Sequence, residues 1–303
     1  MAIPTLSIVI RALNEAEHLP HLLDGIKTQT RQPLEVVLVD SGSTDATVQI
    51  ARDHGARITH ITPADFSFGR ALNVGCRAAQ GDVLVFASAH VRPVDDRWLE
   101  HLTDAFTHDD VALSYGRQVG DERTKLSEQR VMARWFPESS DMDQSHPFSN
   151  NANCAVRASV WRELPYNENL TGLEDVDWAN RAQALGHRLI YQADAPVVHV
   201  HEESYRGIVN RYRREAVAHR TIFADQRMTG PEAVGLFFAN ASQDVAAAFR
   251  DPKGLRDLAW VPAFRAAQFW GTYKGFRQLG PISSELKKRF YYPDTTDRQK
   301  SAT

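Results

Sequence analysis

The most informative segment of this sequence is Asp82-Val-Leu-Val-Phe-Ala-Ser88-Ala-His90-Val-Arg92. Its apolar run, Val83–Phe86, predicts a buried strand that ends abruptly in small and polar residues. In a sheet with helices on both faces, ligands bind where the carboxyl ends of the strands stop. Ser88 and His90 are two positions apart, so their side chains would lean the same way if the strand continued. We therefore expect a ligand site at this strand end. The segment itself leaves open whether Ser88 and His90 bind a metal ion, a phosphate or neither.

Strands and helices alternate on both sides of this stretch. Apolar runs rich in branched residues at 3–10, 34–39 and 57–61 come before it, and segments with helical spacing separate them. This alternation predicts an α/β fold with a mostly parallel sheet flanked by helices. Pro93 and Asp95 are expected to open another helix. Further strands are expected at Val111–Val119, Asn151–Val156 and Val197–Val200.

The pattern becomes helical from Ser204 on. We expect an α/β domain at 1–203, in which 1–110 is a nucleotide-binding half and 111–203 an acceptor and catalytic half. A helical C-terminal extension would follow at 204–293, and 294–303 would be a disordered tail.

Composition and charge exclude several classes of protein. A hydrophobic fraction of 43% and a charged fraction of 24% are those of an ordinary soluble globular protein. The net charge of -3 gives no case for nucleic-acid binding. No apolar run approaches the roughly 18–20 residues that cross a bilayer, and no signal peptide is recognisable, so we expect a cytoplasmic protein. The glycine motifs of dinucleotide enzymes and P-loop NTPases are missing.

The most specific feature is an ordered set of polar segments. They are Asn14-Glu15, Asp40-Ser-Gly-Ser-Thr-Asp45, Ser88-Ala-His90, Asn151 with Asn153, and Gly172-Leu-Glu174-Asp175-Val-Asp177. In this order the set resembles the GT-A-fold glycosyltransferases of family 2, which are inverting enzymes that use nucleotide-diphosphate sugars. The resemblance covers roughly two-thirds of the chain, and the segments Phe68–Asn73 and Ser88–His90 look closest to rhamnosyltransferase-like members.

The resemblance implies a donor site along the first strands. Asp40 corresponds to an Asp that contacts uracil in the family, and a carboxylate accepts well from a nucleobase N–H. Arg70 is expected to face the diphosphate, with Asn14, Glu15, Ser88 and His90 also on the donor side. The alternatives are that Asp40 caps a turn and that Arg70 is a solvated surface residue.

The expected metal site departs from the family pattern. Most members have Asp-x-Asp where this chain has Ser88-Ala-His90, and those carboxylates hold Mg²⁺ or Mn²⁺ against the diphosphate. Imidazole binds transition metals, so one hypothesis is a Mn²⁺-like ion held by His90 with His199 or His201. A second is metal-independent catalysis in which His90 and Arg70 contact the diphosphate. A third is a lost site.

The acidic segment is expected to supply the catalytic base. Glu174 and Asp175 open a helix, and adjacent residues on a helix point about 100° apart, so one of them faces the donor. The resemblance assigns the base to Asp175, with Glu174 beside it. Asn151 and Asn153 are expected to line the acceptor side. Trp178 is either a sugar-stacking platform or a core residue.

The resemblance implies an inverting transferase that moves a sugar from a UDP- or dTDP-sugar to a saccharide or lipid-linked saccharide hydroxyl in bacterial envelope polysaccharide synthesis. The alternatives are a catalytically silent nucleotide-sugar-binding or assembly protein and a sugar nucleotidyltransferase. An arginine stripe on the helical extension is either a solvated face or a contact with the inner face of the cell membrane. Exposed aromatic residues there would form a homodimer interface, a lid or a membrane contact. These residues are Arg206, Arg213 and Arg220, and Trp260, Phe264 and Trp270.

Overall fold

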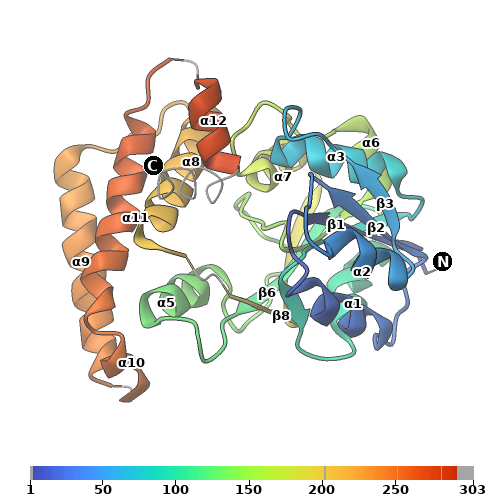
Figure 1. The fold of residues 1–303 in the computed structure, drawn as a ribbon, viewed down its shortest axis with the longest axis horizontal. Coiled ribbons are helices and arrows are strands. Elements are labelled where there is room, and N and C mark those ends of the chain that lie inside the picture. The colour runs from blue at the N-terminus through green and yellow to red at the C-terminus, as the bar shows by residue number, and fades with distance from the viewer. Residues whose placement is uncertain (1–2, 201–202, 251, 281, 292–303) are drawn as a thin grey trace. The chain divides into compact units, whose positions relative to one another are not determined.

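The computed structural model describes residues 3–200, 203–250, 252–280 and 282–291 (Figure 1). The chain forms two compact units. The sheet unit consists of Met1–Asp121, Met132–Asn169 and Glu174–Val200, and the helical unit of Glu122–Val131, Leu170–Leu173 and His201–Thr303. Two short segments thus join the helical unit from within the region that we expected to be one α/β domain. His201 and the expected tail at 294–303 lie outside the described residues.

The strands are β1 (Leu6–Ala12), β2 (Glu35–Asp40), β3 (Arg57–His60), β4 (Val83–Ser88), β5 (Val91–Pro93), β6 (Val111–Val119), β7 (Asn153–Arg157) and β8 (Arg188–His199). The helices up to the last strand are α1 (Leu19–Lys27), α2 (Thr47–Asp53), α3 (Phe68–Ala78), α4 (Trp98–Thr103), the short η1 (Asp104–Thr107), α5 (Leu126–Trp135), α6 (Ala158–Glu163) and α7 (Glu174–Ala184). The helices after it are α8 (Tyr205–Ile222), α9 (Gly230–Ala248), α10 (Pro252–Arg256), α11 (Trp260–Phe276) and α12 (Ser284–Tyr291).

The eight strands form one sheet in the order β3-β2-β1-β4-β7-β6-β8-β5. Strands β1 to β4 pair in parallel. Strand β7 is antiparallel to both β4 and β6, so β6 runs in the same direction as β4, and β8 is parallel to β6. Six strands therefore point one way, whereas β5 and β7 point the other way. The predicted α/β fold with a mostly parallel sheet is confirmed.

This direction brings the polar segments to one edge of the sheet. The register pairs Arg11 with Ser88 and Ala12 with Asp40, so the ends of β1, β2 and β4 coincide. Strand β5 pairs Val91 with His199, which places the end of β8 beside the turn that contains His90. Strand β7 begins at the same edge. Side chains from distant parts of the chain thus meet at the carboxyl edge, as expected for a ligand site in such a sheet.

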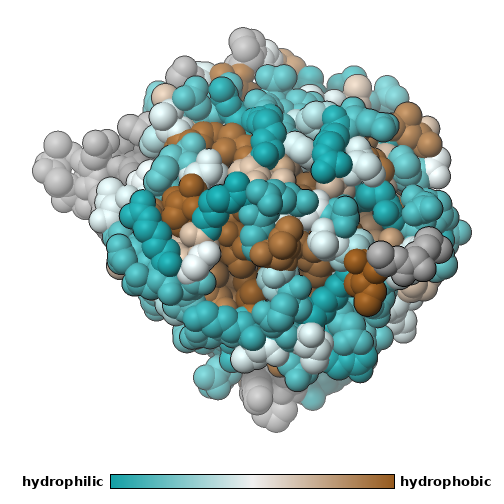
Figure 2. All heavy atoms as spheres, turned by 90° about the vertical axis from the view of Figure 1, so that its right-hand side faces the viewer, coloured by the Kyte–Doolittle hydropathy of each residue, from teal (hydrophilic) through white to brown (hydrophobic). Residues whose placement is uncertain are grey.

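The core lies on both faces of the sheet because successive strand residues point to opposite sides. Leu6, Ile8 and Ile10 of β1 belong to a buried cluster on one face. Val9 belongs to the cluster on the other face, together with Leu72 and others. Seen from the side of β1–β3, hydrophilic side chains cover most of the surface and break up the hydrophobic areas (Figure 2).

Three local predictions need correction. Strand β4 ends at Ser88, and after a turn Pro93 ends the short strand β5 rather than opening a helix. Strand β5 is last in the sheet order, where a residue without an N–H is tolerated. Strand β8 begins at Arg188 and not near residue 197, and Asn151 precedes β7 instead of lying on it.

The helical unit is built on the close crossing of α8 and α11. A Cβ atom added at Gly271 would lie 2.5 Å from the carbonyl oxygen of Val209, so glycine permits this approach. Buried Asp244 of α9 accepts hydrogen bonds from Arg265 of α11 at 2.7 and 3.0 Å. None of the helices in the described ranges combines the length and the hydrophobicity that a bilayer crossing requires.

The structure corrects two expectations about this unit. Arg213 donates to the side chain of Gln278 at 2.7 Å, and Arg220 donates to the carbonyl oxygen of Gln278 at 2.6 Å. Two members of the arginine stripe therefore bind the chain just beyond α11 and do not form a solvated face. Phe264, expected to be exposed, is 2% exposed and belongs to the core of this unit.

Candidate active site

Two buried carboxyl groups begin helix α7. The carboxylate of Asp175 accepts hydrogen bonds from the backbone N–H groups of Asn151 at 3.0 Å and Val176 at 2.9 Å. Glu174 accepts a hydrogen bond from Arg11 at 3.2 Å. The two acids are 5% and 8% exposed, which is unusual for neighbouring carboxyl groups. The two acids therefore differ in their partners: Glu174 pairs with a positively charged side chain, whereas Asp175 accepts only from neutral backbone N–H groups.

This environment changes the protonation of Asp175. Burial, and next the negative charge of Glu174, raise the pKa of Asp175 to about 7. The hydrogen bonds from Asn151 and Val176 and the charge of Arg11 act in the opposite direction but are weaker. A general base works best when its pKa lies near the operating pH. Asp175 thus has a pKa that suits proton transfer near neutral pH, and its role as the base stays a prediction.

Arg11 belongs to this site, although the sequence analysis did not select it. It is the penultimate residue of β1, follows a run of buried residues and donates to the carbonyl oxygen of Phe68 at 3.3 Å. Its guanidinium group lies 5.0 Å from the centre of the Phe68 ring. The signal in the sequence was a positively charged residue at the carboxyl end of an apolar strand. A charged side chain there needs a polar partner, because the strand around it is buried.

A second group of side chains is centred on His90. His90 Nδ1 lies 3.0 Å from Glu15 Oε1, and its Nε2 lies 3.1 Å from His199 Nε2. His199 Nδ1 lies 2.6 Å from Gln118 Oε1, and Ser88 Oγ lies 3.2 Å from His90 Nε2. Four residues that we expected on the donor side or at a metal are thus brought together: Glu15, Ser88, His90 and His199. Gln118 also belongs to this group, although no pattern in the sequence indicated it.

The donor atoms of this group do not by themselves form a metal site. Two imidazole nitrogens face one another, and imidazole binds transition-metal ions. Within the described ranges, however, no group of three or more His, Cys, Asp or Glu side chains is arranged to hold a metal ion. Metal binding by His90 and His199 therefore stays a prediction.

The loop after β2 is held by its own side chains. The Asp40 carboxylate accepts from the N–H groups of Gly42 and Ser43 and contacts His60 Nδ1 at 3.2 Å. Gly42 has a φ of 104°, which favours glycine in this turn. Burial would raise the pKa of Asp40, but the hydrogen bonds from Ser43 and the others outweigh it, so the pKa is lowered. These contacts are those of an Asp40 that caps the turn, which was the alternative expectation. A contact of Asp40 with a nucleobase stays a prediction.

Asn14 ties the first two loops together. Its backbone φ is 55°, which Asn tolerates better than most residues. Its side-chain oxygen accepts from the N–H of Thr44 at 2.8 Å, and its own N–H donates to Ser43 Oγ at 3.0 Å. Asn14 thus shapes the edge of the site, and its contact with a donor stays a prediction.

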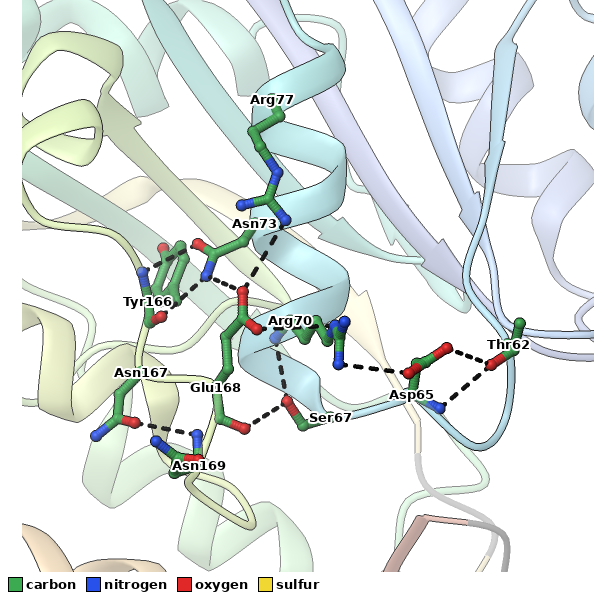
Figure 3. A network of polar contacts seen from close by, with 10 residues as sticks. All are labelled: Thr62, Asp65, Ser67, Arg70, Asn73, Arg77, Tyr166, Asn167, Glu168 and Asn169. Atoms are coloured by element: carbon green, nitrogen blue, oxygen red, sulfur yellow. Dashed lines mark hydrogen bonds and ion pairs between the residues drawn. The ribbon is translucent and has the colours of Figure 1, made fainter.

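Arg70 lies in a network at the start of α3 (Figure 3). Its guanidinium group is 3.5 Å from Asp65 and 3.8 Å from Glu168, and its side chain is 46% exposed. Ser67 caps α3 by accepting from the Arg70 N–H and donates to the carbonyl oxygen of Glu168 at 2.8 Å. Arg70 is thus neither isolated nor buried, and its contact with a diphosphate stays a prediction.

Asn73 fastens the segment before α7 to α3 (Figure 3). It is 2% exposed, donates to Tyr166 O and Glu168 Oε1, both at 2.9 Å, and accepts from Tyr166 N and Trp161 Nε1. Asn73→Leu should leave several buried polar groups unpaired, at roughly 1–3 kcal/mol each. We expect a clear fall in the urea midpoint, whereas exposed Asn169→Ala should leave it unchanged. An unchanged midpoint for Asn73→Leu would contradict this role.

Of the residues expected on the acceptor side, one lies at the site and two are buried in the core. Asn151 lies against Asp175 through its backbone, and its side-chain nitrogen is buried with no hydrogen-bond partner in the described part of the chain. Asn153 is a correction, because it is 0% exposed and bonds to Trp98, Arg117 and Ala195 inside the sheet unit. Trp178 is also 0% exposed, so the core alternative is right and it is no sugar platform.

Comparison with known proteins identifies the class of protein to which this site belongs. The model of Glycosyl transferase family 2 matches residues 7–164, more than half of the 303 residues. The chain therefore belongs to glycosyl transferase family 2 and is a glycosyltransferase. Family membership removes the nucleotidyltransferase alternative.

Among its relatives are two O-antigen chain rhamnosyltransferases. RfbN of Salmonella typhimurium is 29% identical over 228 residues, which cover 71% of this chain and 72% of that protein. WbaN of Salmonella anatum is 27% identical, with coverage of 72% and 71%. A PGL/p-HBAD biosynthesis glycosyltransferase of Mycobacterium bovis is 42% identical over 93 residues, which cover 29% of this chain and 36% of that protein.

Solved structures share the fold. The mannosyltransferase PcManGT of Pyrobaculum calidifontis, in complex with GDP-Man and Mn²⁺, has a TM-score of 0.59 and 21% identity, and the match covers 91% of this chain and 85% of that one. Glucosyl-3-phosphoglycerate synthase of Mycobacterium tuberculosis, in complex with phosphoglyceric acid, has a TM-score of 0.53 and 20% identity, with coverage of 73% and 79%. At these identities the likeness concerns the fold.

Proposed function

We propose that this glycosyltransferase inverts the anomeric centre as it moves a sugar, a deoxyhexose such as rhamnose being the first candidate, from a UDP- or dTDP-sugar to a saccharide hydroxyl during envelope polysaccharide assembly. The observation that carries the proposal is the buried carboxyl of Asp175 at the carboxyl edge of the sheet, whose pKa is raised to about 7. The names of the Salmonella relatives support the sugar and the acceptor class.

Asp175 acts as the general base. It takes the proton of an acceptor hydroxyl while that oxygen forms a bond to the anomeric carbon of the donor sugar. The bond from that carbon to the diphosphate breaks on the opposite side, and the diphosphate keeps the electron pair. The products are an inverted glycoside, a nucleoside diphosphate and a protonated Asp175. Glu174 and Arg11 hold this base in a buried, polar setting.

The departing diphosphate needs positive charge at the other side of the site. His90 and His199 would hold a divalent ion such as Mn²⁺, and the bound ion would stabilise the charge of the diphosphate. PcManGT was solved with Mn²⁺, which supports this part of the proposal. In the metal-independent alternative, His90 and Arg70 donate hydrogen bonds to the diphosphate directly.

Two alternatives lose support. The membrane contact through the arginine stripe loses its basis, because Arg213 and Arg220 are bonded within the helical unit. The catalytically silent alternative is weakened by Asp175, since a binding protein has no use for a buried acid with a raised pKa. The homodimer stays a prediction, which light scattering of the protein in solution would check.

The pH dependence of turnover tests the base. Because Asp175 must be ionised and its pKa is about 7, kcat/KM should rise with pH through about 7 and level off above it. Below this pKa each pH unit should lower the rate roughly tenfold. Initial rates between pH 5.5 and 8.5 at saturating metal would show this. A profile that is flat between pH 5.5 and 8 would contradict the assignment.

The proposed reaction is tested with a panel of UDP-, dTDP- and GDP-sugars in the presence of envelope saccharide acceptors. We expect nucleoside diphosphate release from one donor and a product of inverted anomeric configuration by NMR. A product of retained configuration would contradict the mechanism. Binding of a donor without release, with all acceptors supplied, would favour the catalytically silent alternative.

A further inference from the structure

Helix α9 of the helical unit exposes large apolar side chains to solvent. Its buried residues are small or polar: Ala233, Asp244 and Ala248. Val234, Leu236 and Phe238 are exposed, Phe238 by 65%. Asp244 is the only charged residue of the sequence 233–249 and it is buried, so the exposed side of this stretch carries no charge. A surface helix normally turns its large apolar residues toward the core, so this side of α9 is suited to contact with a partner.

The apolar surface continues onto α11. Helix α9 packs against α11 (Figure 1), and a groove of about 350 Å³ lies between the two helices. Its walls include Phe237 of α9 and Trp270 of α11, and Trp270 is 49% exposed. None of the described residues that line the groove carries a charge. A contiguous exposed apolar patch of this kind marks a contact with a protein or a membrane.

Positive charge surrounds this apolar surface. Residues 204–293 contain fifteen Lys and Arg but only seven Asp and Glu, an excess of eight positive charges in a chain whose net charge is -3. Arg250 follows α9 closely and is exposed. Lys274 of α11 is also exposed, and its Nζ lies 4.9 Å from the centre of the Trp270 ring. The charge of this part of the chain therefore favours a negatively charged partner.

Two kinds of partner could cover such a surface, a second copy of this chain or a lipid bilayer. In a symmetric dimer the same patch lies on both subunits, so the positively charged extension would meet itself, and like charges across an interface are unfavourable. Anionic lipid headgroups attract Lys and Arg instead. Exposed Trp, Phe and Leu side chains beside Lys and Arg are typical of helices that lie in the membrane interface.

We propose that the apolar surface formed by Val234, Leu236 and Phe238 of α9 and Trp270 of α11 docks on anionic membrane lipid. The apolar side chains enter the boundary between headgroups and acyl chains, while Arg250 and Lys274 contact the headgroups. This surface differs from the arginine stripe of α8. The inference goes beyond the proposed reaction and does not depend on it.

The test is cosedimentation of the full chain with vesicles of phosphatidylcholine, and with vesicles of equal parts phosphatidylcholine and phosphatidylglycerol. We expect binding to the anionic vesicles only. Phe238→Ser should lower the affinity by roughly tenfold, because a Phe side chain loses its transfer into an apolar environment. Lys274→Gln should lower it by about fivefold, the contribution of one cation near such a surface.

Leu185→Ser is the matched control. Leu185 is also 65% exposed, but it belongs to the sheet unit, so this variant should bind like the wild type. The melting temperature of each variant checks its folding, and Lys274→Gln keeps the test open if Phe238→Ser does not fold.

Several results would overturn the proposal. They are no binding to anionic vesicles, equal binding to neutral vesicles, unchanged affinity in both variants, or an equal loss in Leu185→Ser. A dimeric mass by light scattering that Phe238→Ser makes monomeric, without vesicle binding, would assign the surface to a second copy. Because binding is read without donor or acceptor, absence of glycosyl transfer would contradict the proposed function and leave this inference standing.

Discussion

Asp175→Asn is expected to lower the rate of glycosyl transfer by roughly 10²–10⁴-fold, the usual contribution of a positioned proton acceptor. The amide has almost the shape of the carboxyl group and can still accept from the N–H of Asn151, but it cannot take a proton from the acceptor. Donor affinity should therefore be retained. Initial rates of nucleoside diphosphate release and calorimetric donor binding would measure the two effects separately.

The matched control for this variant lies two residues further on the same helix. Asp177 is also buried, but its carboxylate pairs with Arg181 at 2.8 Å. Asp177→Asn should therefore retain most of the activity of the folded enzyme. If Asp175→Asn turned over at the wild-type rate, or if both variants lost activity equally, the assignment of the base would be wrong.

The same variant has an expected effect on stability. The folded-state pKa of Asp175 is raised above its ordinary value near 4, so this group favours folding when protonated. That contribution is fully present below about pH 4 and is lost as pH rises through about 7. Asp175→Asn removes the titration, so the melting temperature should differ less between pH 5 and pH 8 than in the wild type.

Removal of the divalent ion is expected to have the second large effect. EDTA should abolish measurable turnover, and Mn²⁺ should restore it better than Mg²⁺. His90→Leu should lower kcat by roughly 10²–10³-fold, the range seen when one group that stabilises developing charge is removed. Nucleoside diphosphate release in chelator-treated and metal-restored samples would measure both.

The exposed residue His108 provides the control, because it lies before β6 at the opposite edge of the sheet. His108→Leu should behave like the wild type. Turnover that EDTA does not change, combined with a large loss in His90→Leu, would favour direct contact of His90 with the diphosphate. Full activity of His90→Leu would remove His90 from the mechanism altogether.

The fold and the acid pair could be predicted from sequence because their signals are local. The apolar run in Val83–Phe86 and its polar end predicted a strand end with a site, and the adjacent acids Glu174 and Asp175 marked the start of α7. The prediction that Pro93 opens a helix was wrong, because proline is common both at the start of helices and in edge strands. The sequence does not show that β5 is an edge strand, since this depends on the order of strands in the sheet.

The rest of the site depends on residues that only the sheet brings together. Arg11 and Glu174 are 163 positions apart, and Gln118 and His199 are 81 positions apart. No pattern within one segment of the sequence predicts such contacts between distant residues. The acceptor role expected of Asn153 was wrong for the converse reason, because a polar residue near a site segment can be fully engaged by the core. Trp178, for which the core was one of two expectations, is engaged there in the same way.

The proposed role of Asp175 as general base is tested most directly by the titration of its own carboxyl group. In protein labelled with ¹³C at the aspartate carboxyl groups, the resonance that Asp175→Asn removes identifies this group. We predict that its chemical shift changes with a midpoint at about pH 7, because the carboxyl group is buried beside Glu174. A midpoint near the ordinary aspartate value of about 4 would show that Asp175 is not a base with a raised pKa.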